Sequence, residues 1–274
     1  MIADALAKRL NQPVIVENKV GAGGSIAAKD TAKSPSDGYT ILIVSSAIAV
    51  NPAVYKGADE VVEQLKPIAL IGYLPTVLMA SSEFPAKNMR EFIEYAKNNP
   101  NKVNYGSSGI GGSTQMAMEA FSEVTGIKLS HIPFKGNAQA SAALMGNQID
   151  AMMDTLLLAS PVIKGGKGKG LAISGSQRSA LIPNVPTFAE AGVPGYNTGL
   201  FFGAMGPAGL SDELTSKLNK EINEALKEPS VRERLIQTGG LTLEPGSPQD
   251  FKKILNEEIA LWQRIAKSAG IARQ

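Results

Sequence analysis

The stretch Val103–Ser113, with the sequence VNYGSSGIGGS, carries the clearest fold signal in this chain of 274 residues. Its first three residues predict a strand that ends where the glycines begin, and Ser113 is the predicted N-cap of a helix. A loop of glycine and serine at this junction exposes backbone N–H groups and hydroxyls, and the helix dipole places partial positive charge behind them. The stretch predicts a strand–loop–helix unit, and its loop is either an anion site or a plain surface turn.

Segments on both sides of this stretch repeat the order of strand and then helix. Short apolar and β-branched runs predict strands at 14–16, 39–44, 68–71, 77–79, 103–105, 129–132, 149–153 and 171–173. Asn88, with Glu91 three residues later, forms a capping-box pattern that predicts a helix start. Strands that alternate with helices indicate parallel βαβ units, and therefore an α/β fold with helices on both faces of a sheet.

The last quarter of the chain is predicted to be helical. Leucine or isoleucine recurs every four residues from 214 to 226, and Ser247-Pro248-Gln249-Asp250 has an N-cap, a proline at N1 and an acidic N3. Helices without intervening strands look like a cap that packs on an earlier lobe. The length suits two lobes of roughly 100–150 residues. We expect one lobe of residues 1–103 and 206–274 and another of residues 104–205, with the chain crossing near Val103 and near 202–207.

Composition excludes several classes of site. The chain has no cysteine, so it has no disulfide, thiolate metal site or cysteine nucleophile. A histidine-rich metal site or a Ser-His-Asp triad would depend on the single histidine, His131, for which a strand-end position bonded to backbone is the favoured interpretation. The net charge is +2 and the lysines are scattered, which argues against nucleic-acid binding. No metal and no cofactor are expected.

Nucleotide and membrane signals are weak. Ile26 stands where the third glycine of a dinucleotide fingerprint would follow Gly21-Ala22-Gly23-Gly24, so a tight turn is favoured there, and no Walker motif is present. No run of about 18 apolar residues predicts a membrane span. The chain begins at Met1 inside a predicted amphipathic helix, without a signal-peptide pattern.

Two carboxylates flank the apolar run at 149–153. The period of a strand places Asp150 and Asp154 on the same side, with Asp154 near the carboxyl end. A carboxylate at that position serves as a helix cap, a loop anchor or a ligand contact. The two carboxylates could instead form a general acid and base pair, but no histidine and no second carboxylate cluster supports that interpretation.

Several motifs in collinear order resemble those of one family. They are VENKVGAGG at 16–24, DGYT at 37–40, NP at 51–52, YGSSG at 105–109, PFKG at 133–136, GNQID at 146–150, PNVPTFAEAG at 183–192 and GPAG at 206–209. They are similar to the motifs of the substrate-binding proteins of tripartite tricarboxylate transporters, also called Bug receptors. The resemblance extends from residue 14 to the end, so it covers almost the whole chain.

The resemblance implies a type II periplasmic-binding fold, in which two α/β lobes enclose a ligand. It implies a periplasmic, monomeric protein that captures a small carboxylate for the permease subunits of a tripartite tricarboxylate transporter. Di- and tricarboxylates, aromatic acids and amino acids are the implied ligands, held by amides, hydroxyls and water. The ligand-binding residues implied by motif position are Ser45, Ser46, Ser107, Ser108, Gly109, Gly112, Ser113, Thr114 and Asp154.

Two departures from the family pattern bear on these expectations. Gln115 stands where many members have a histidine, which indicates a different ligand preference. The family begins with a strand and a glycine-rich loop ahead of the helix that opens this chain. We therefore expect either that such a segment belongs ahead of Met1 or that the carboxylate clamp is built differently here.

Two other functions remain open at this point. One is a ligand-loaded sensor of the same fold that contacts a signalling receptor instead of a permease. The other is an α/β enzyme, against which the single histidine, the absence of cysteine and the lack of a nucleophile elbow argue.

Overall fold

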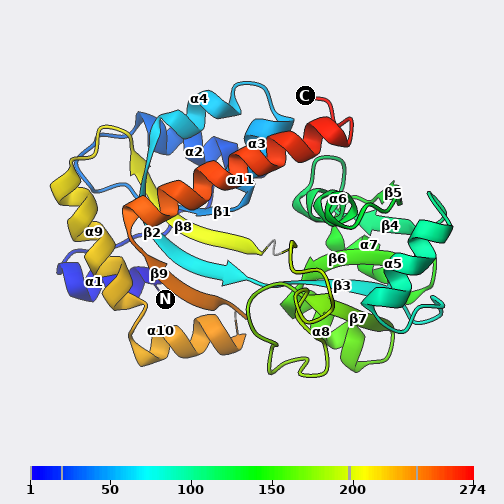
Figure 1. The fold of residues 1–274 in the computed structure, drawn as a ribbon. Helices are drawn as coiled ribbons and strands as arrows, with labels where there is room; N and C mark the ends of the chain where they lie inside the picture. The colour runs from blue at the N-terminus through cyan, green and yellow to red at the C-terminus, as the bar shows by residue number, and fades with distance from the viewer. Residues whose placement is uncertain (1, 20, 197–198, 239) are drawn as a thin grey trace. The chain divides into compact units, whose positions relative to one another are not determined.

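The computed structural model describes residues 2–19, 21–196, 199–238 and 240–274. The chain divides into two compact units (Figure 1). Unit 1 comprises residues 1–74, 200–264 and 272–274, and unit 2 comprises residues 75–199 and 265–271. None of the described helices combines the length and the apolar character that a membrane span requires.

Unit 1 is built on an antiparallel sheet. Its strands, in spatial order, are β1 (Leu42–Ser45), β8 (Leu200–Pro207), β2 (Leu65–Leu74) and β9 (Thr242–Gly246). The helices of this unit are α1 (Ile2–Leu10), α2 (Ser25–Lys33), α3 (Ala47–Val54), α4 (Ala58–Glu63), α9 (Asp212–Ala225), α10 (Pro229–Glu233) and most of α11 (Pro248–Ser268), with a 3-10 turn at Ala22–Gly24 and a π-helical turn at Arg234–Thr238.

The two faces of this sheet are covered by different helices. On one face, Leu6 of α1 and Ile222 of α9 share an apolar core with Ala204 of β8. Because side chains alternate along a strand, the neighbouring Gly203 faces the other side, where it lies against the ring of Phe251 from α11. The strands are therefore apolar on both faces, as expected for a sheet that is covered on both sides.

Unit 2 contains a mixed sheet. Its strands, in spatial order, are β5 (Ser130–Pro133), β4 (Asn104–Ser107), β6 (Ala151–Thr155), β3 (Thr76–Ser81) and β7 (Gly168–Ile173). Strand β4 is parallel to β5 and β6, whereas β3 is antiparallel to β6 and β7. The helices are α5 (Met89–Asn98), α6 (Ser113–Thr125), α7 (Asn137–Met145) and α8 (Leu156–Lys164) (Figure 1). Because β4, β5 and β6 are parallel, their carboxyl ends lie at one edge of the sheet.

The predicted helix starts are confirmed. The Oδ1 of Asn88 accepts a hydrogen bond from the N–H of Glu91 at 3.0 Å, and Oε2 of Glu91 accepts one from the N–H of Lys87 at 2.8 Å. Ser247 and Asp250 form the reciprocal pair at the start of α11, with distances of 3.0 and 3.1 Å between backbone nitrogen and side-chain oxygen. One prediction of this kind is wrong, because the N-cap of α6 is Gly112, and Ser113 is its first helical residue.

Two predictions about the strands are corrected. The buried strand at 14–16 does not form, and the side chains of Ile15 and Val16 are 84% and 67% exposed. The parallel arrangement holds for β4, β5 and β6. It is wrong for β3, which is antiparallel to β6 and β7, and for the sheet of unit 1. There, β8 comes from late in the sequence and lies antiparallel between β1 and β2.

The units also differ from the expected boundaries at 103 and 206. Residues 75–103, which hold β3 and α5, belong to unit 2 because β3 pairs with β6 and β7. Strand β8 from Leu200 belongs to unit 1. Alternation of strand and helix cannot show this, since the sheet that a strand joins depends on pairing between distant segments.

Candidate functional site

The glycine- and serine-rich loop connects the carboxyl end of β4 to the N-terminus of α6. Met116 donates the first intrahelical hydrogen bond, from its N–H to the carbonyl of Gly112 at 3.0 Å. The N–H groups of residues 113–115 precede it, so they have no acceptor within the helix. The N-cap Gly112 has no side chain to fill this position. The start of α6 therefore presents three backbone donors and the positive end of a helix dipole.

A hydroxyl pair holds the loop against the helix. The backbone N–H of Ser108 donates to Oγ1 of Thr114 at 2.9 Å, and the two hydroxyl oxygens are 3.1 Å apart. Thr114 is buried and Ser108 is half-buried. Gln115 adds a second connection, because its Oε1 accepts the N–H of Gly111 at 2.7 Å. These two bonds fix the shape of the loop before any ligand binds.

The hydroxyl pair is linked to a buried carboxyl group through α7. Oγ1 of Thr114 lies 3.5 Å from Oδ1 of Asn137, the first residue of α7. The Nδ2 of Asn137 donates to Oδ1 of Asp154 at 2.9 Å. Asp154 lies in β6, one strand away from β4. Polar residues from the ends of three elements therefore lie together at the carboxyl edge of the parallel strands, where ligands bind in α/β sheets.

Asp154 is 0% exposed, and only one of its oxygens is bonded. Oδ1 accepts from Asn137 and from the N–H of Thr155 at 2.8 Å, whereas Oδ2 has no hydrogen-bond partner among the described residues. Burial raises the pKa of this carboxyl group from 3.8 to about 6. A buried acceptor without a partner costs folding free energy, so such groups call for a functional explanation.

Behind the loop lies a second network, centred on His131 of β5. Its Nε2 is 2.6 Å from Oγ of Ser107, and that oxygen also accepts the N–H of Gly109 at 3.1 Å. The imidazole ring stacks on Tyr105 at a centroid distance of 4.9 Å. The hydroxyl of Tyr105 donates to Oε1 of Glu119 at 2.5 Å. This network supports the base of the loop.

The Ser107–His131 pair does not form a nucleophilic centre in this structure. Ser107 is completely buried, so its oxygen cannot reach the carbonyl group of an external substrate. The expected partner of the His131 side chain was backbone, but its Nε2 contacts the hydroxyl of Ser107 instead. Among the described residues, there is no group of three metal-ligating side chains.

Ser45 and Ser46 belong to unit 1, while the other predicted residues belong to unit 2. Ser45 ends β1 and is half-buried. Ser46 is buried at the start of α3, where its backbone N–H donates to the carbonyl of Phe201 at 3.0 Å.

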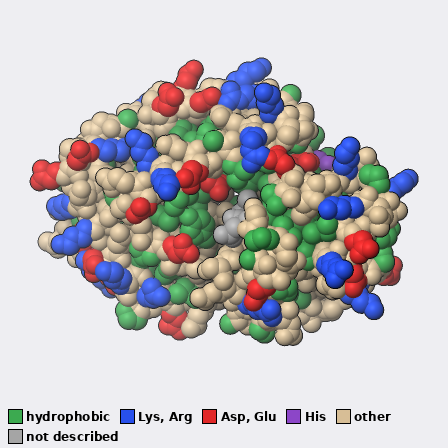
Figure 2. All heavy atoms as spheres, viewed as in Figure 1, with side chains coloured by type: hydrophobic (Ala, Val, Ile, Leu, Met, Phe, Trp, Pro, Cys, Tyr) green, Lys and Arg blue, Asp and Glu red, His purple; other side chains and the backbone are tan. Residues whose placement is uncertain are grey.

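Asn137 and the contact of His131 with Ser107 were not predicted from the sequence. A signal for Asn137 existed, because a polar residue follows Gly136 just after a predicted strand that runs parallel to 103–105. Such a position lies at the same sheet edge as the loop. Figure 2 shows acidic and basic side chains interspersed over the face in view, so the charges on this face give no comparable signal for a ligand.

The chain matches known proteins over nearly its whole length. A model of the family described as the tripartite tricarboxylate transporter family receptor matches residues 1–271. A UPF0065 protein of Bordetella pertussis (strain Tohama I) is 35% identical over 272 residues, which cover 98% of this chain and 83% of the relative.

Two solved structures extend this similarity to the fold. The R. palustris protein Rpa4515 with adipate is 32% identical, with a TM-score of 0.79 and coverage of 100% of this chain and 92% of that chain. MatC from Rhodopseudomonas palustris with bound malate is 29% identical, with a TM-score of 0.74 and coverage of 96% and 91%. The predicted α/β fold of the periplasmic-binding type is thereby confirmed.

Proposed function

Because this chain belongs to the tripartite tricarboxylate transporter family of receptors, which are periplasmic solute-binding proteins, we propose that it captures a small carboxylate for the permease subunits of such a transporter. In this proposal, the protein acts as a monomer in the periplasm and has no catalytic role. The two similar structures support a carboxylate, since one is described with adipate and the other with malate.

The start of α6 is the observation that carries this proposal. Three N–H groups without intrahelical acceptors, backed by the helix dipole, suit one carboxylate group. The hydroxyl of Ser108 lies beside them and is already oriented by Thr114. Neutral donors held in place need little reorganisation when the anion binds, which favours affinity.

Asp154 supports a second element of recognition. Its oxygen Oδ2 lacks a partner among the described residues, and its carboxyl group is connected to the loop through Asn137 and Thr114. An ionised Asp154 accepts a hydrogen bond from a hydroxyl or ammonium group of the ligand, and a protonated one donates to a carboxylate oxygen. We therefore place hydroxy and amino acids ahead of unsubstituted diacids as ligands.

A thermal-shift screen of organic acids, followed by calorimetry, tests this function. A true ligand at 100 times its Kd adds about 2.7 kcal/mol to the free energy of unfolding. For the best acid we expect Ser108→Ala to weaken binding by about 1 kcal/mol, because a hydroxyl donor to a charged oxygen is lost. If no acid stabilises the protein, or if Ser108→Ala leaves the affinity of every ligand unchanged, the proposed site is wrong.

Malate and succinate provide a sharper comparison for Asp154, since they differ by one hydroxyl group. Asp154→Asn should reduce the affinity for malate more than that for succinate. Equal losses for the two acids would contradict recognition of the hydroxyl group, while leaving carboxylate binding at α6 intact.

A further inference from the structure

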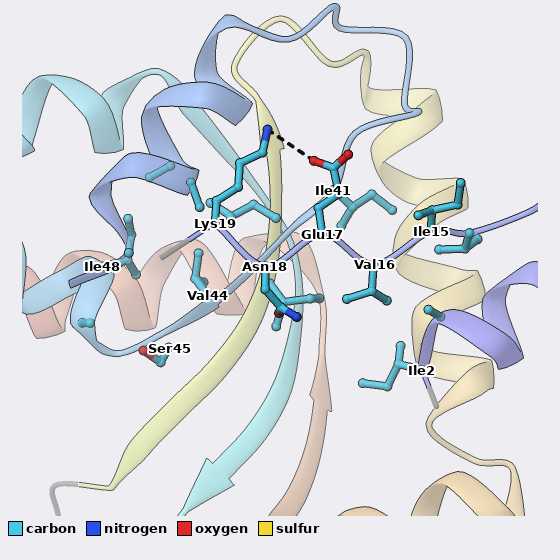
Figure 3. Close-up of a pocket in the computed structure, with 18 of the residues that line it drawn as sticks. Ile2, Ile15, Val16, Glu17, Asn18, Lys19, Ile41, Val44, Ser45 and Ile48 are labelled. Carbon is cyan, nitrogen blue, oxygen red and sulfur yellow. Dashed lines mark ion pairs between the residues drawn. The ribbon is translucent and has the colours of Figure 1, made fainter. Parts of the chain in front are cut away.

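The groove that Figure 3 shows in unit 1 offers little to a charged ligand. Its volume is about 850 Å³, and most of the described residues that line it are apolar. The lysine among them, Lys19, already forms ion pairs with Glu17 at 3.3 Å and with Asp30. The single histidine of the chain lies elsewhere, behind the loop that precedes α6 in unit 2.

His131 is connected to the start of α6 by three contacts in series. Its Nε2 lies 2.6 Å from Oγ of Ser107. That oxygen lies 3.1 Å from the backbone nitrogen of Gly109 and 3.2 Å from its carbonyl oxygen. The carbonyl of Gly109 in turn accepts the N–H of Gly112, the N-cap of α6, at 3.1 Å. A change at the histidine ring therefore acts on the loop up to the residue at which the helix begins.

The imidazole ring has a fixed place and still reaches solvent. Strand β5 is the edge strand of its sheet, and β4 is its partner. From β4, Ser107 bonds the ring and Tyr105 stacks on it with 22° between the ring planes. Glu119 of α6 is bonded to the hydroxyl of Tyr105. His131 is half-buried, and burial lowers its pKa below 6.5, so the ring exchanges its proton in mild acid without unfolding.

The hydroxyl of Ser107 has one hydrogen, so its bonds depend on the charge of the imidazole. A neutral ring that carries its hydrogen on Nδ1 accepts the serine hydrogen at Nε2, while Oγ accepts the N–H of Gly109. A protonated ring donates from Nε2, so the serine hydrogen turns to the carbonyl of Gly109. Protonation therefore adds a positive charge behind the loop and bonds Ser107 to both backbone polar groups of Gly109.

We propose that His131 is a positioning residue of the candidate site, which acts through Ser107 on Gly109 and strengthens carboxylate binding when it is protonated. This inference rests on the proposed function, because it concerns the affinity of the same loop for an acid. An imidazolium behind Gly109 adds to the positive end of the α6 dipole and attracts the anion. By linkage, a bound carboxylate holds the proton on His131 more tightly. Ser107 is completely buried, so it transmits the effect without contacting the ligand.

Nuclear magnetic resonance on the full chain tests the connection without a ligand. The imidazole of His131 gives the only histidine signals, because the chain has a single histidine. We expect the amide signal of Gly109 to titrate with the same midpoint as the ring. His131→Gln, which keeps a polar group but takes up no proton, should abolish this transition. Ser107→Ala should reduce it at Gly109 while the ring still titrates.

Tyr105→Phe is the matched control for a general loosening of the network. It removes the bond to Glu119 but keeps a ring stacked on His131 and leaves the contact with Ser107 in place. In this variant the Gly109 amide should still follow the titration of the ring. Loss of the Gly109 transition in Tyr105→Phe would contradict a connection that runs through Ser107.

Calorimetry with succinate measures the consequence for affinity. Burial raises the pKa of Asp154 to about 6, so Asp154 titrates in the same range, and every protein compared carries Asp154→Asn. Succinate is the probe because it lacks the hydroxyl group that Asp154 is proposed to recognise. Between pH 7.5 and pH 5.5, we expect its affinity to rise about threefold more with His131 than with His131→Gln. The comparison between the two proteins cancels the ionisation of succinate itself.

The outcomes separate this inference from the proposed function. A Gly109 amide that does not follow the ring, or that follows it equally in Ser107→Ala, would overturn the inference whatever the protein binds. The same pH dependence of succinate affinity in His131→Gln would also overturn it. If no variant binds an acid while Gly109 still follows the ring, the connection between His131 and Gly109 is supported and the proposed function is wrong.

Discussion

Asn137 donates a hydrogen bond from its Nδ2 to Oδ1 of Asp154 at 2.9 Å, and its Oδ1 lies 3.5 Å from Oγ1 of Thr114. One amide side chain thus connects a buried carboxyl group in β6 with the glycine- and serine-rich loop ahead of α6. The connection explains why Oδ1 of Asp154 is satisfied, whereas Oδ2 has no hydrogen-bond partner among the described residues.

The buried carboxyl group makes stability depend on pH. The pKa of Asp154 is raised to about 6 in the folded protein, so between pH 4 and 6 the folded state binds more protons than the unfolded state. Stability therefore falls as pH rises through this window, and the shift from 3.8 corresponds to about 3 kcal/mol. We expect urea unfolding to show that the free energy of unfolding decreases less from pH 4 to pH 7 in Asp154→Asn than in the natural protein. The same decrease in both proteins would show that another group is responsible.

The hydroxyl of Thr114 should matter for ligand affinity through the shape of the loop. Thr114→Val keeps the side-chain volume but removes the acceptor for the N–H of Ser108. We expect an acid ligand to bind about fivefold to tenfold more weakly, corresponding to about 1 kcal/mol, as measured by calorimetry. Thr125→Val, at the far end of the same helix, removes a bond to the carbonyl of Phe121 and should leave the affinity unchanged. Equal losses of ligand affinity in Thr114→Val and Thr125→Val would indicate a general effect on α6 instead of a specific effect on the loop.

His131 should make the protein less stable in mild acid. Burial lowers its pKa below 6.5, so the unfolded state binds the proton more readily than the folded state. The stability contributed by neutral His131 is present above pH 6.5 and decreases as the pH falls below that value. His131→Phe retains a ring beside Tyr105. We expect the melting temperature of this variant to change less between pH 7 and pH 5 than that of the natural protein. An identical pH profile for the two proteins would contradict this assignment.

The single tryptophan reports on a half-buried carboxyl group in α11. The indole N–H of Trp262 donates to Oε2 of Glu258 at 2.5 Å, and burial raises the pKa of Glu258 to about 7. We expect the fluorescence of Trp262 to titrate with a midpoint near pH 7, as the bonded oxygen gains or loses its charge. Glu258→Gln should abolish this transition, whereas Glu257→Gln, on the exposed neighbouring residue, should preserve it.

Local signals in the sequence were sufficient for many elements of the fold. The start of α5 follows from Asn88 and Glu91, and the start of α11 follows from Ser247 and Asp250, because each cap involves residues only three positions apart. The strand–loop–helix unit at β4 and α6 was predictable for the same reason. Its donors are backbone groups whose positions follow from where the strand ends and the helix begins.

Contacts between distant segments decided the rest. Residues 14–16 have the composition of a buried strand, yet Ile15 and Val16 are exposed, because a strand forms only where another strand offers it hydrogen bonds. The order β1-β8-β2-β9 places late residues between early ones, which no local pattern records. In the site, Ser108, Thr114, Asn137 and Asp154 meet only because parallel strands bring their carboxyl ends to one edge of the sheet. The sequence by itself determined which donors and carboxylates the site could use, and the tertiary structure determined which of them are buried, bonded or free.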